Sequence, residues 1–261
     1  TTLVDSLLAF CGAMELNRAE LDCVLDSDPL EKERGITITS KNCAVTYRPH
    51  SGDHADETCR INIIDTPGHA DFGGEVERVL KMADGILLLV DAFEGPMPQT
   101  RFVLGKALEL DHQIIVVVNK CDRPNARVDE VVNEVFDLLV ALDASDERLD
   151  FHVIYASGRD GWSSTESDVH EGDMQPLLDA IMSHLPAPVG YADVPLQMLI
   201  ASADYSPYAG RIAIGRIVSG ALTAGQAVTI CHKNKNRTAR AQKVYRFKDL
   251  GKTPAEIISV G

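Results

Sequence analysis

The first 187 residues alternate short apolar runs with segments whose apolar residues recur every three or four positions. Runs of four to eight apolar residues have the length of buried strands, whereas the longer periodic segments are typical of amphipathic helices. This alternation predicts an α/β fold with a mostly parallel sheet. We expect strands at 42–48, 60–65, 85–92, 113–119 and 152–156, and helices at 2–10, 99–110, 128–142 and 174–185.

Two further stretches of this region are predicted to be loops, because 14–41 and 161–168 are polar and lack clear periodicity. Two prolines within 185–191 then indicate a stiff linker. Beyond it the pattern changes to short alternating runs at 196–202, 211–219, 227–231 and 239–246, separated by glycine and asparagine turns. We therefore predict two domains, an α/β domain at 1–187 and a small all-β barrel at 188–261.

The composition fits a soluble globular protein, with 45% hydrophobic and 25% charged residues. No apolar run reaches the roughly 18–20 residues that a membrane span needs, and no signal peptide is apparent. The six cysteines form no CxxC pair and no metal-ligand spacing. They indicate reduced thiols of a cytoplasmic protein rather than disulfides or a zinc site.

The net charge of −14 is unevenly distributed. Residues 1–187 carry 15 Lys and Arg against 35 Asp and Glu, a balance of −20, whereas 188–261 carry 10 against 4, a balance of +6. The acidic first part argues against sequence-independent nucleic-acid binding, since phosphates would be repelled. The basic second part could dock on RNA.

The motif Asp65-Thr-Pro-Gly-His follows a predicted strand. An aspartate at such a strand tip can hold Mg²⁺ through a water, and the backbone N–H of Gly68 can approach a γ-phosphate closely. His69 then lies where a side chain could orient an attacking water. Taken alone, the motif is explained equally well by a tight Pro-Gly turn.

The motif Asn119-Lys-Cys-Asp follows another predicted strand. The carboxylate of Asp122 can accept two hydrogen bonds, from N1–H and the exocyclic amine of guanine, which adenine does not present in that arrangement. Lys120 can lie along the base, and Asn119 can tie neighbouring loops together. A polar loop with a surface salt bridge is the alternative, but the two motifs in this order indicate a GTPase.

Two weaker features fit the same order. Small residues at Ser157 and Gly158, after the next strand, would let a backbone N–H reach guanine O6. Thr37, which ends the polar loop, could complete a Mg²⁺ shell with its hydroxyl. Without the other motifs, a β-branched start of a strand explains Thr37 as well.

A phosphate-binding loop of the form G-x-x-x-x-G-K-[ST] occurs nowhere in the 261 residues. The first helix is nevertheless predicted to begin at Thr1-Thr-Leu. We therefore expect that Thr1 is the hydroxyl ligand of Mg²⁺, that Thr2 lies at the nucleotide, and that the first strand, the glycine cradle and the lysine are absent. For the chain as printed this predicts weak or no GTP binding.

These motifs resemble the elongation-factor class of translational GTPases, and the chain is similar over its whole length to the TypA/BipA family. The resemblance is carried by 31–38, 65–72, 72–80, 91–104, 119–122, 142–151 and 204–217. It implies a P-loop GTPase domain followed by a domain II barrel. The chain would be a fragment at both ends, because the family's glycine-lysine segment is missing and 259–261 fall within the expected barrel.

The resemblance also implies a ribosome-associated, GTP-hydrolysing switch between GTP and GDP, linked to stress adaptation and large-subunit assembly. Its partners would be rRNA and ribosomal proteins, and it would act as a monomer. In this family the matching residues imply that Thr1 and Thr37 ligate Mg²⁺, with Asp65 acting through a water. Gly68 would sense the γ-phosphate and His69 would position the water, with Ile36 as part of a hydrophobic gate. Guanine would be read by Asn119, Lys120 and Asp122, helped by Ser157 and Gly158.

A nucleotide-free module that binds RNA or the ribosome is an alternative. It is suggested by the basic segment 232–237 with Arg240, Lys243, Arg246 and Lys248. A solvated hairpin face explains the same charges, and the sequence alone favours that interpretation. A metal hydrolase built on His69 and Asp71 is disfavoured, because the ligands lack the spacing of a shared site.

Overall fold

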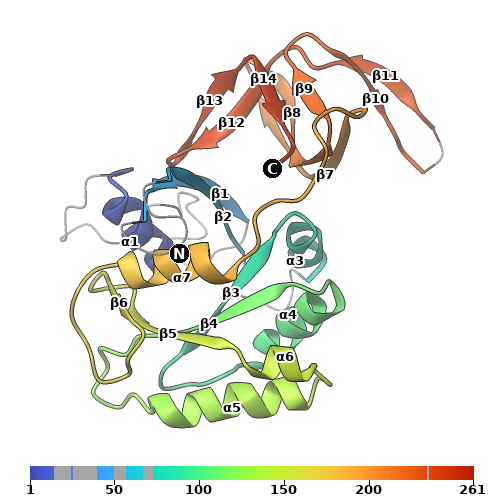
Figure 1. The fold of residues 1–261 in the computed structure, drawn as a ribbon. Helices are drawn as coiled ribbons and strands as arrows, with labels where there is room; N and C mark the ends of the chain where they lie inside the picture. Colours follow the sequence, from blue (N-terminus) through green and yellow to red (C-terminus); the bar gives the residue numbers. More distant parts are fainter. Residues whose placement is uncertain (15–24, 26–39, 50–56, 67–72, 234) are drawn as a thin grey trace. The chain divides into compact units, whose positions relative to one another are not determined.

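The computed structural model describes residues 1–14, 25, 40–49, 57–66, 73–233 and 235–261. The chain divides into two compact units, Thr1–Pro186 and Ala187–Gly261 (Figure 1). The expected loop at 14–41 lies almost entirely outside the described residues. Among the helices that the structure describes, none is long and apolar enough to cross a membrane.

The first unit is built on a four-stranded sheet in the order β3–β4–β5–β6. Strands β3 (Gly85–Asp91), β4 (Gln113–Asn119) and β5 (His152–Ser157) are parallel, and β6 (Trp162–Ser164) runs antiparallel to β5. The parallel strands are connected through α4 (Pro98–Glu109), and through α5 (Val128–Val140) with the short α6 (Asp146–Leu149). The predicted α/β fold with a mostly parallel sheet is confirmed.

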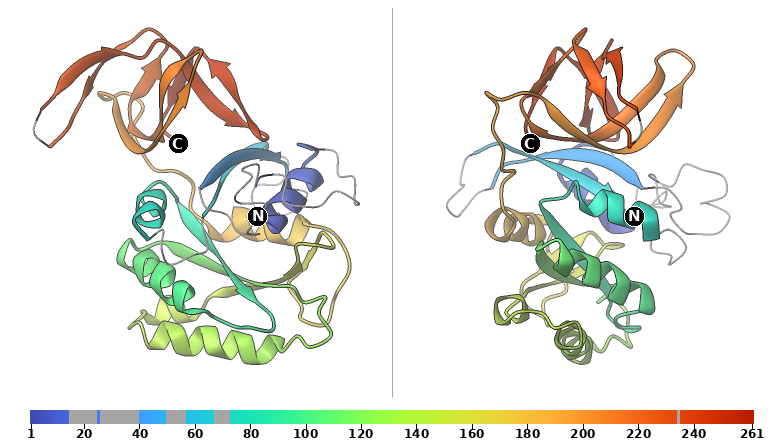
Figure 2. Two further views of the ribbon diagram at one scale, coloured as in Figure 1. Left: turned by 180° about the vertical axis from the view of Figure 1, so that it is seen from behind. Right: turned by 90° about the vertical axis from the view of Figure 1, so that its right-hand side faces the viewer.

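Strand β4 is covered on both faces, which explains its unbroken apolar run. Val116 and Val118 pack into one core with α5, whereas Ile115 and Val117 pack into another with α7 (Gln175–His184). All four side chains are fully buried. In Figure 2, α7 and α1 (Thr2–Phe10) lie on the opposite side of the sheet from α4 and α5. Strands enclosed in this way are apolar throughout rather than alternating.

Strands β1 (Lys41–Tyr47) and β2 (Cys59–Asp65) form a separate antiparallel pair in which Lys41 lies opposite Asp65. The Tyr47 hydroxyl donates to Asp179 Oδ1 at 2.6 Å and thereby ties the pair to α7. Cys43 packs under α1, and burial, followed by the charge of Asp65, raises the pKa of its thiol to about 12. The five cysteines that the structure describes are all free thiols.

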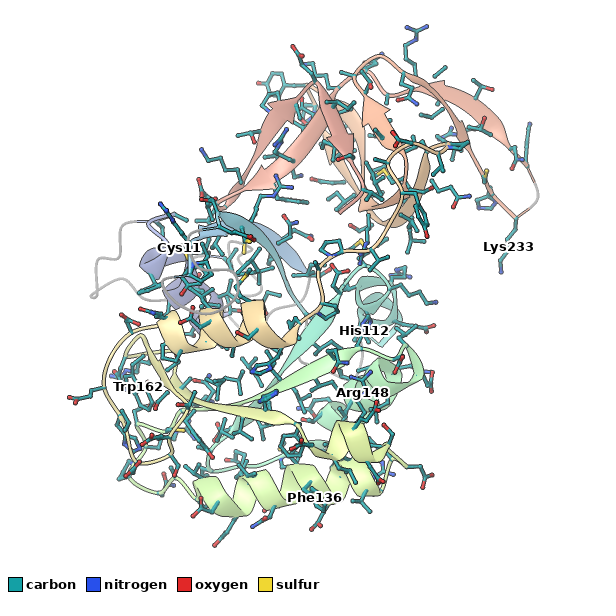
Figure 3. The ribbon with its side chains drawn as sticks, viewed as in Figure 1. Cys11, His112, Phe136, Arg148, Trp162 and Lys233 are labelled. Carbon is teal, nitrogen blue, oxygen red and sulfur yellow. The ribbon has the colours of Figure 1, made fainter. Side chains whose placement is uncertain are left out.

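The segment 161–168, expected to be a loop, contains β6 instead. Its composition is polar, but Trp162 packs into the core of the sheet and Ser163 is buried (Figure 3). The Ser163 hydroxyl donates to the Asp173 carbonyl at 3.1 Å and accepts from the Leu177 amide at 3.2 Å. These bonds to residues beyond the segment satisfy the Ser163 hydroxyl and so allow this polar side chain to be buried. Helix α3 (Gly73–Leu80) and α6 were not predicted either.

The second unit consists of antiparallel strand pairs. The pairs are β7 (Gln197–Ser206) with β8 (Gly210–Ser219), β9 (Ala221–Thr223) with β14 (Ile257–Ser259), β10 (Ala227–Ile230) with β11 (Arg237–Arg240), and β12 (Val244–Lys248) with β13 (Gly251–Ala255). The single strand expected at 239–246 is wrong, because β11 and β12 divide that run. At the break, the Ala241 amide donates to the Gln226 carbonyl at 2.9 Å and its carbonyl accepts from the Gly225 amide at 2.6 Å.

Gly215 on β8 lies opposite Ile200, beside a shift in the register of β7 and β8. A Cβ at this position would overlap the Leu199 carbonyl oxygen and lie 2.8 Å from its carbon. Gly215→Ala is therefore expected to destabilise the second unit by about 1–3 kcal/mol, the usual cost of overpacking. The measurement is amide hydrogen exchange, with the protection of the second unit evaluated separately from that of the first. Gly251→Ala is the control, since its Cβ would make only an ordinary contact at 3.7 Å; equal protection in both variants would contradict the prediction.

His152 and His184 stack with ring centroids 3.3 Å apart. Burial, followed by the charge of His152, lowers the pKa of His184. The unfolded chain therefore binds a proton at His184 more readily than the folded chain does. The contribution of His184 to the free energy of unfolding is fully present above about pH 6.5 and is lost as the pH drops through that value. Between about pH 7.5 and about pH 5.5 we expect the Tm to fall less in His184→Gln than in the parent. If the Tm falls equally in both proteins, the His152–His184 pair does not contribute to the pH dependence of stability.

Candidate nucleotide-binding site

The carboxyl ends of the three parallel strands meet at one edge of the sheet. Asp91 ends β3 and lies beside Asn119, which ends β4, and Asn119 lies beside Ala156 of β5. The loops that follow these strands therefore leave the sheet side by side. This is the edge at which open α/β sheets bind their ligands.

The side chain of Asn119 connects two of these loops. Its Oδ1 accepts a hydrogen bond from the Gly158 amide at 2.9 Å. The backbone adds a second connection, since the Cys121 amide donates to the Ala156 carbonyl at 3.1 Å. The segment 119–122 is thus fixed to the tip of β5 through both a side chain and the main chain.

Within this segment, Cys121 and Asp122 face different surroundings. Cys121 is buried, its Sγ donates to the Val118 carbonyl at 3.2 Å, and burial raises the pKa of the thiol. Asp122 is exposed, and among the described residues its carboxylate makes no hydrogen bond or ion pair. The loop therefore presents two carboxylate oxygens as acceptors at the edge of the sheet.

Lys120 has a left-handed backbone conformation, with φ of 68°. Its Nζ lies 2.8 Å from Asp91 Oδ2, and Arg123 contacts the same oxygen at 3.5 Å. Burial by itself raises the pKa of Asp91, but the Lys120 bond and the amides of Phe93 and Glu94 outweigh it and lower the pKa. An ionised Asp91 thus holds Lys120 across the tips of β3 and β4.

Gly158 packs closely on the start of α1. A Cβ on Gly158 would lie 3.0 Å from Leu3 Cα, and the Ser6 hydroxyl donates to the Gly158 carbonyl at 2.6 Å. Ser157 is fully buried and its hydroxyl donates to Asp160 Oδ2 at 3.0 Å. The Gly158 N–H already donates to Asn119, so its approach to guanine O6 requires that bond to be shared or broken.

The phosphate side is described at three of the predicted residues. The Thr1 hydroxyl donates to Asp65 Oδ2 at 2.6 Å, so the start of α1 and the tip of β2 lie together, and Thr2 is the first residue of α1. Hydroxyl and carboxylate oxygens are the ligands that Mg²⁺ prefers, so Thr1 and Asp65 fit that ion. The predicted residues Ile36, Thr37, Gly68 and His69 lie outside the described residues.

The family described as the elongation factor Tu GTP binding domain matches residues 1–187. The chain belongs to this family. Over its whole length it is 50% identical to the large ribosomal subunit assembly factor BipA of Salmonella typhimurium and 47% identical to that of Bacillus subtilis. It is also 47% identical to a putative TypA-like chloroplast elongation factor of Arabidopsis thaliana. These relatives confirm the resemblance to TypA/BipA.

The chain spans only part of these relatives, 42% and 41% of the bacterial proteins and 38% of the plant protein. Among solved structures, the bacterial selenocysteine-specific elongation factor EF-Sec matches all of this chain and 38% of its own, with a TM-score of 0.67. At 20% identity that likeness shows a shared fold and nothing about its ligands.

The elongation-factor motifs identified both of the strand-tip loops that the structure joins, but two residues that position them were missed. Asp91 could have been recognised, since it ends an apolar strand as Asp65 does. Ser6 could not be recognised from the sequence, because its hydroxyl donates to the Gly158 carbonyl, 152 positions away. Only the packing of α1 against the tip of β5 reveals that contact.

Proposed function

We propose that the protein is a GTP-hydrolysing translation factor that binds the ribosome and switches between a GTP and a GDP state. The observation that carries the proposal is the Asn119–Gly158 bond, which fixes the loop from which Asp122 presents its exposed carboxylate. The relatives include a large ribosomal subunit assembly factor and a putative elongation factor, and these names support the ribosomal part of the proposal.

In this proposal the described residues read the base. Asp122 accepts from N1–H and the exocyclic amine of guanine, and Lys120 lies along the base plane. Ser157 and Gly158 form the wall beside it. Asn119 holds the two loops in register, so that the acceptors are in place before the nucleotide arrives.

The phosphate side is assigned by the family motifs. Thr1 and Thr37 would hold Mg²⁺, with Asp65 acting through a water, and the ion would neutralise phosphate charge. The Gly68 amide would contact the γ-phosphate. His69 would orient the attacking water, with Ile36 beside it.

We infer a GTP-binding domain at 1–187 and a domain II barrel at 188–261, supported by the paired antiparallel strands of the second unit. We further infer a cytoplasmic monomer. For the 261 residues as printed we expect weak or no GTP binding, since no glycine-lysine cradle is among them; tight binding by a chain of this intact mass would contradict that.

The test of function is phosphate release by the full-length protein with and without ribosomes. Stimulation of about 10³- to 10⁵-fold is expected, as for other activated GTPases, and most of it should be lost in His69→Ala. His170→Ala, in an exposed loop, is the control. Ribosome binding without any stimulated release would favour a nucleotide-free RNA-binding module. Full stimulation in His69→Ala would refute the role of that residue.

A further inference from the structure

Ser6 lies inside helix α1, but its side chain bonds outside that helix. The residue is buried, and its hydroxyl donates to the Gly158 carbonyl at 2.6 Å. A serine within a helix ordinarily faces water or bonds the carbonyl four positions earlier in its own helix. Ser183 of α7 does the latter, since its hydroxyl donates to the Asp179 carbonyl at 2.8 Å. The hydroxyl of Ser6 instead holds the loop that follows β5.

The position of Gly158 leaves little room for a side chain, because the backbone of α1 lies against it. A Cβ here would lie 3.0 Å from both the Cα and the amide nitrogen of Leu3. Glycine has more conformational freedom than any other residue, since it has no Cβ. The close approach of α1 thus brings a freely turning residue to the tip of β5, where the proposed guanine site needs a hydrogen-bond donor in a fixed place.

Two hydrogen bonds remove that freedom, one on each side of the Gly158 Cα. Its N–H donates to Asn119 Oδ1 at 2.9 Å, and its carbonyl accepts from the Ser6 hydroxyl. The first bond holds the peptide group before the Cα and the second holds the peptide group after it. Together they restrain both backbone dihedrals of Gly158, and they do so from different elements, the end of β4 and the middle of α1.

Helix α1 also carries the phosphate side of the proposed site. Thr1 immediately precedes the helix, and its hydroxyl donates to Asp65 Oδ2 at 2.6 Å. The helix is anchored along its length, because Leu3 and Leu7 are buried in the core that it shares with β5. Ser6 therefore connects the base-reading loop to the helix from which the phosphate side of the site begins.

We propose that Ser6 is a positioning residue that determines how well the site recognises O6 of guanine. The proposal deepens the base-reading part of the proposed function and rests on it. The Gly158 N–H is the donor to O6, and Ser6 keeps it in place by holding the carbonyl of the same residue. Without the Ser6 hydroxyl, the buried carbonyl turns towards water or another donor, because a buried acceptor without a partner is costly. The N–H donor then moves with it.

The test compares GDP with 6-thio-GDP, in which sulfur replaces O6 while N1–H and the exocyclic amine remain. Sulfur is the weaker acceptor, so the full-length parent should prefer GDP by about 2- to 13-fold, the value of one neutral hydrogen bond. In Ser6→Ala this preference should disappear. Ser6→Thr keeps the hydroxyl and should retain the preference.

Ser163→Ala is the matched control. It also removes a buried hydroxyl that donates to a carbonyl, that of Asp173 at 3.1 Å, and it should lower the Tm without changing the preference for GDP. A purely structural role of Ser6 would weaken the binding of both nucleotides equally and leave their ratio unchanged. That result, or the same loss of preference in Ser163→Ala, would overturn the proposal.

A second measurement separates this proposal from the proposed function. Amide hydrogen exchange is followed in the nucleotide-free, full-length protein, where Ser6→Ala should speed the exchange of amides 158–160 but not that of β4. Unchanged exchange in this loop would contradict the positioning role, whatever nucleotide the protein binds. If the parent does not bind GDP, the proposed GTPase fails, while faster exchange in Ser6→Ala still supports the positioning of Gly158 by Ser6.

Discussion

Asp122→Asn is expected to change the preference of the site from guanine to xanthine nucleotides. Asparagine keeps one acceptor for N1–H but presents an NH₂ donor where the second carboxylate oxygen was. That donor opposes the exocyclic amine of guanine and matches the carbonyl that xanthine carries there. The lost bond between the exocyclic amine and a charged acceptor, at about 1.5–3 kcal/mol, corresponds to a loss of about 10- to 150-fold in GDP affinity, and the opposition of the two amino groups adds to that loss.

The measurement is competition by GDP and XDP for labelled nucleotide on the full-length protein. Asp137→Asn makes the same chemical change on the exposed side of α5 and should leave the preference unchanged. A site that loses GDP without gaining XDP would indicate that Asp122 maintains the loop rather than reading the base.

Asn119→Ala is expected to weaken both nucleotide binding and the fold of the first unit. The substitution removes the acceptor of the Gly158 amide, a bond of 2.9 Å in a partly buried site. An amide left without its partner costs about 1–3 kcal/mol, which corresponds to about 5- to 150-fold in GDP affinity if the loops no longer hold their register. Calorimetric Tm and GDP titration measure the two effects.

Two further variants locate the cause of the Asn119 effect. Asn119→Asp keeps an acceptor oxygen and should recover most of the Tm, whereas Asn125→Ala changes an exposed side chain of the same loop region and should be neutral. A lower Tm with unchanged GDP affinity would restrict Asn119 to a structural role.

The sequence predicted the elements whose signal is local. Strand β4 was placed at its observed bounds because helices cover both faces and leave an unbroken apolar run. The loop at 119–122 was recognised because its residue types match the hydrogen-bonding edge of guanine. In both cases the information lies within a few consecutive residues.

What the sequence did not predict depends on contacts between distant residues. Strand β6 has a polar composition, and although its backbone pairs with β5, the partners of its Ser163 hydroxyl are the Asp173 carbonyl and the Leu177 amide, at the start of α7. The break between β11 and β12 is stabilised by hydrogen bonds between the backbone of Ala241 and the backbones of Gly225 and Gln226. The periodicity of 239–246 contains no sign of these bonds and therefore predicts one continuous strand. The ion pair between Asp91 and Lys120 likewise connects the ends of two strands. Such pairings become visible only once the register of the sheet is known.

If the tips of β3, β4 and β5 form a guanine-specific nucleotide site, competition between unlabelled nucleotides will show that specificity. Labelled GDP bound to the full-length protein is displaced with GDP, IDP and ADP. IDP lacks the exocyclic amine and should bind about 10- to 150-fold more weakly than GDP, the value of one bond to a charged acceptor, and ADP should not compete. Displacement by ADP at the concentrations at which GDP displaces would contradict the account.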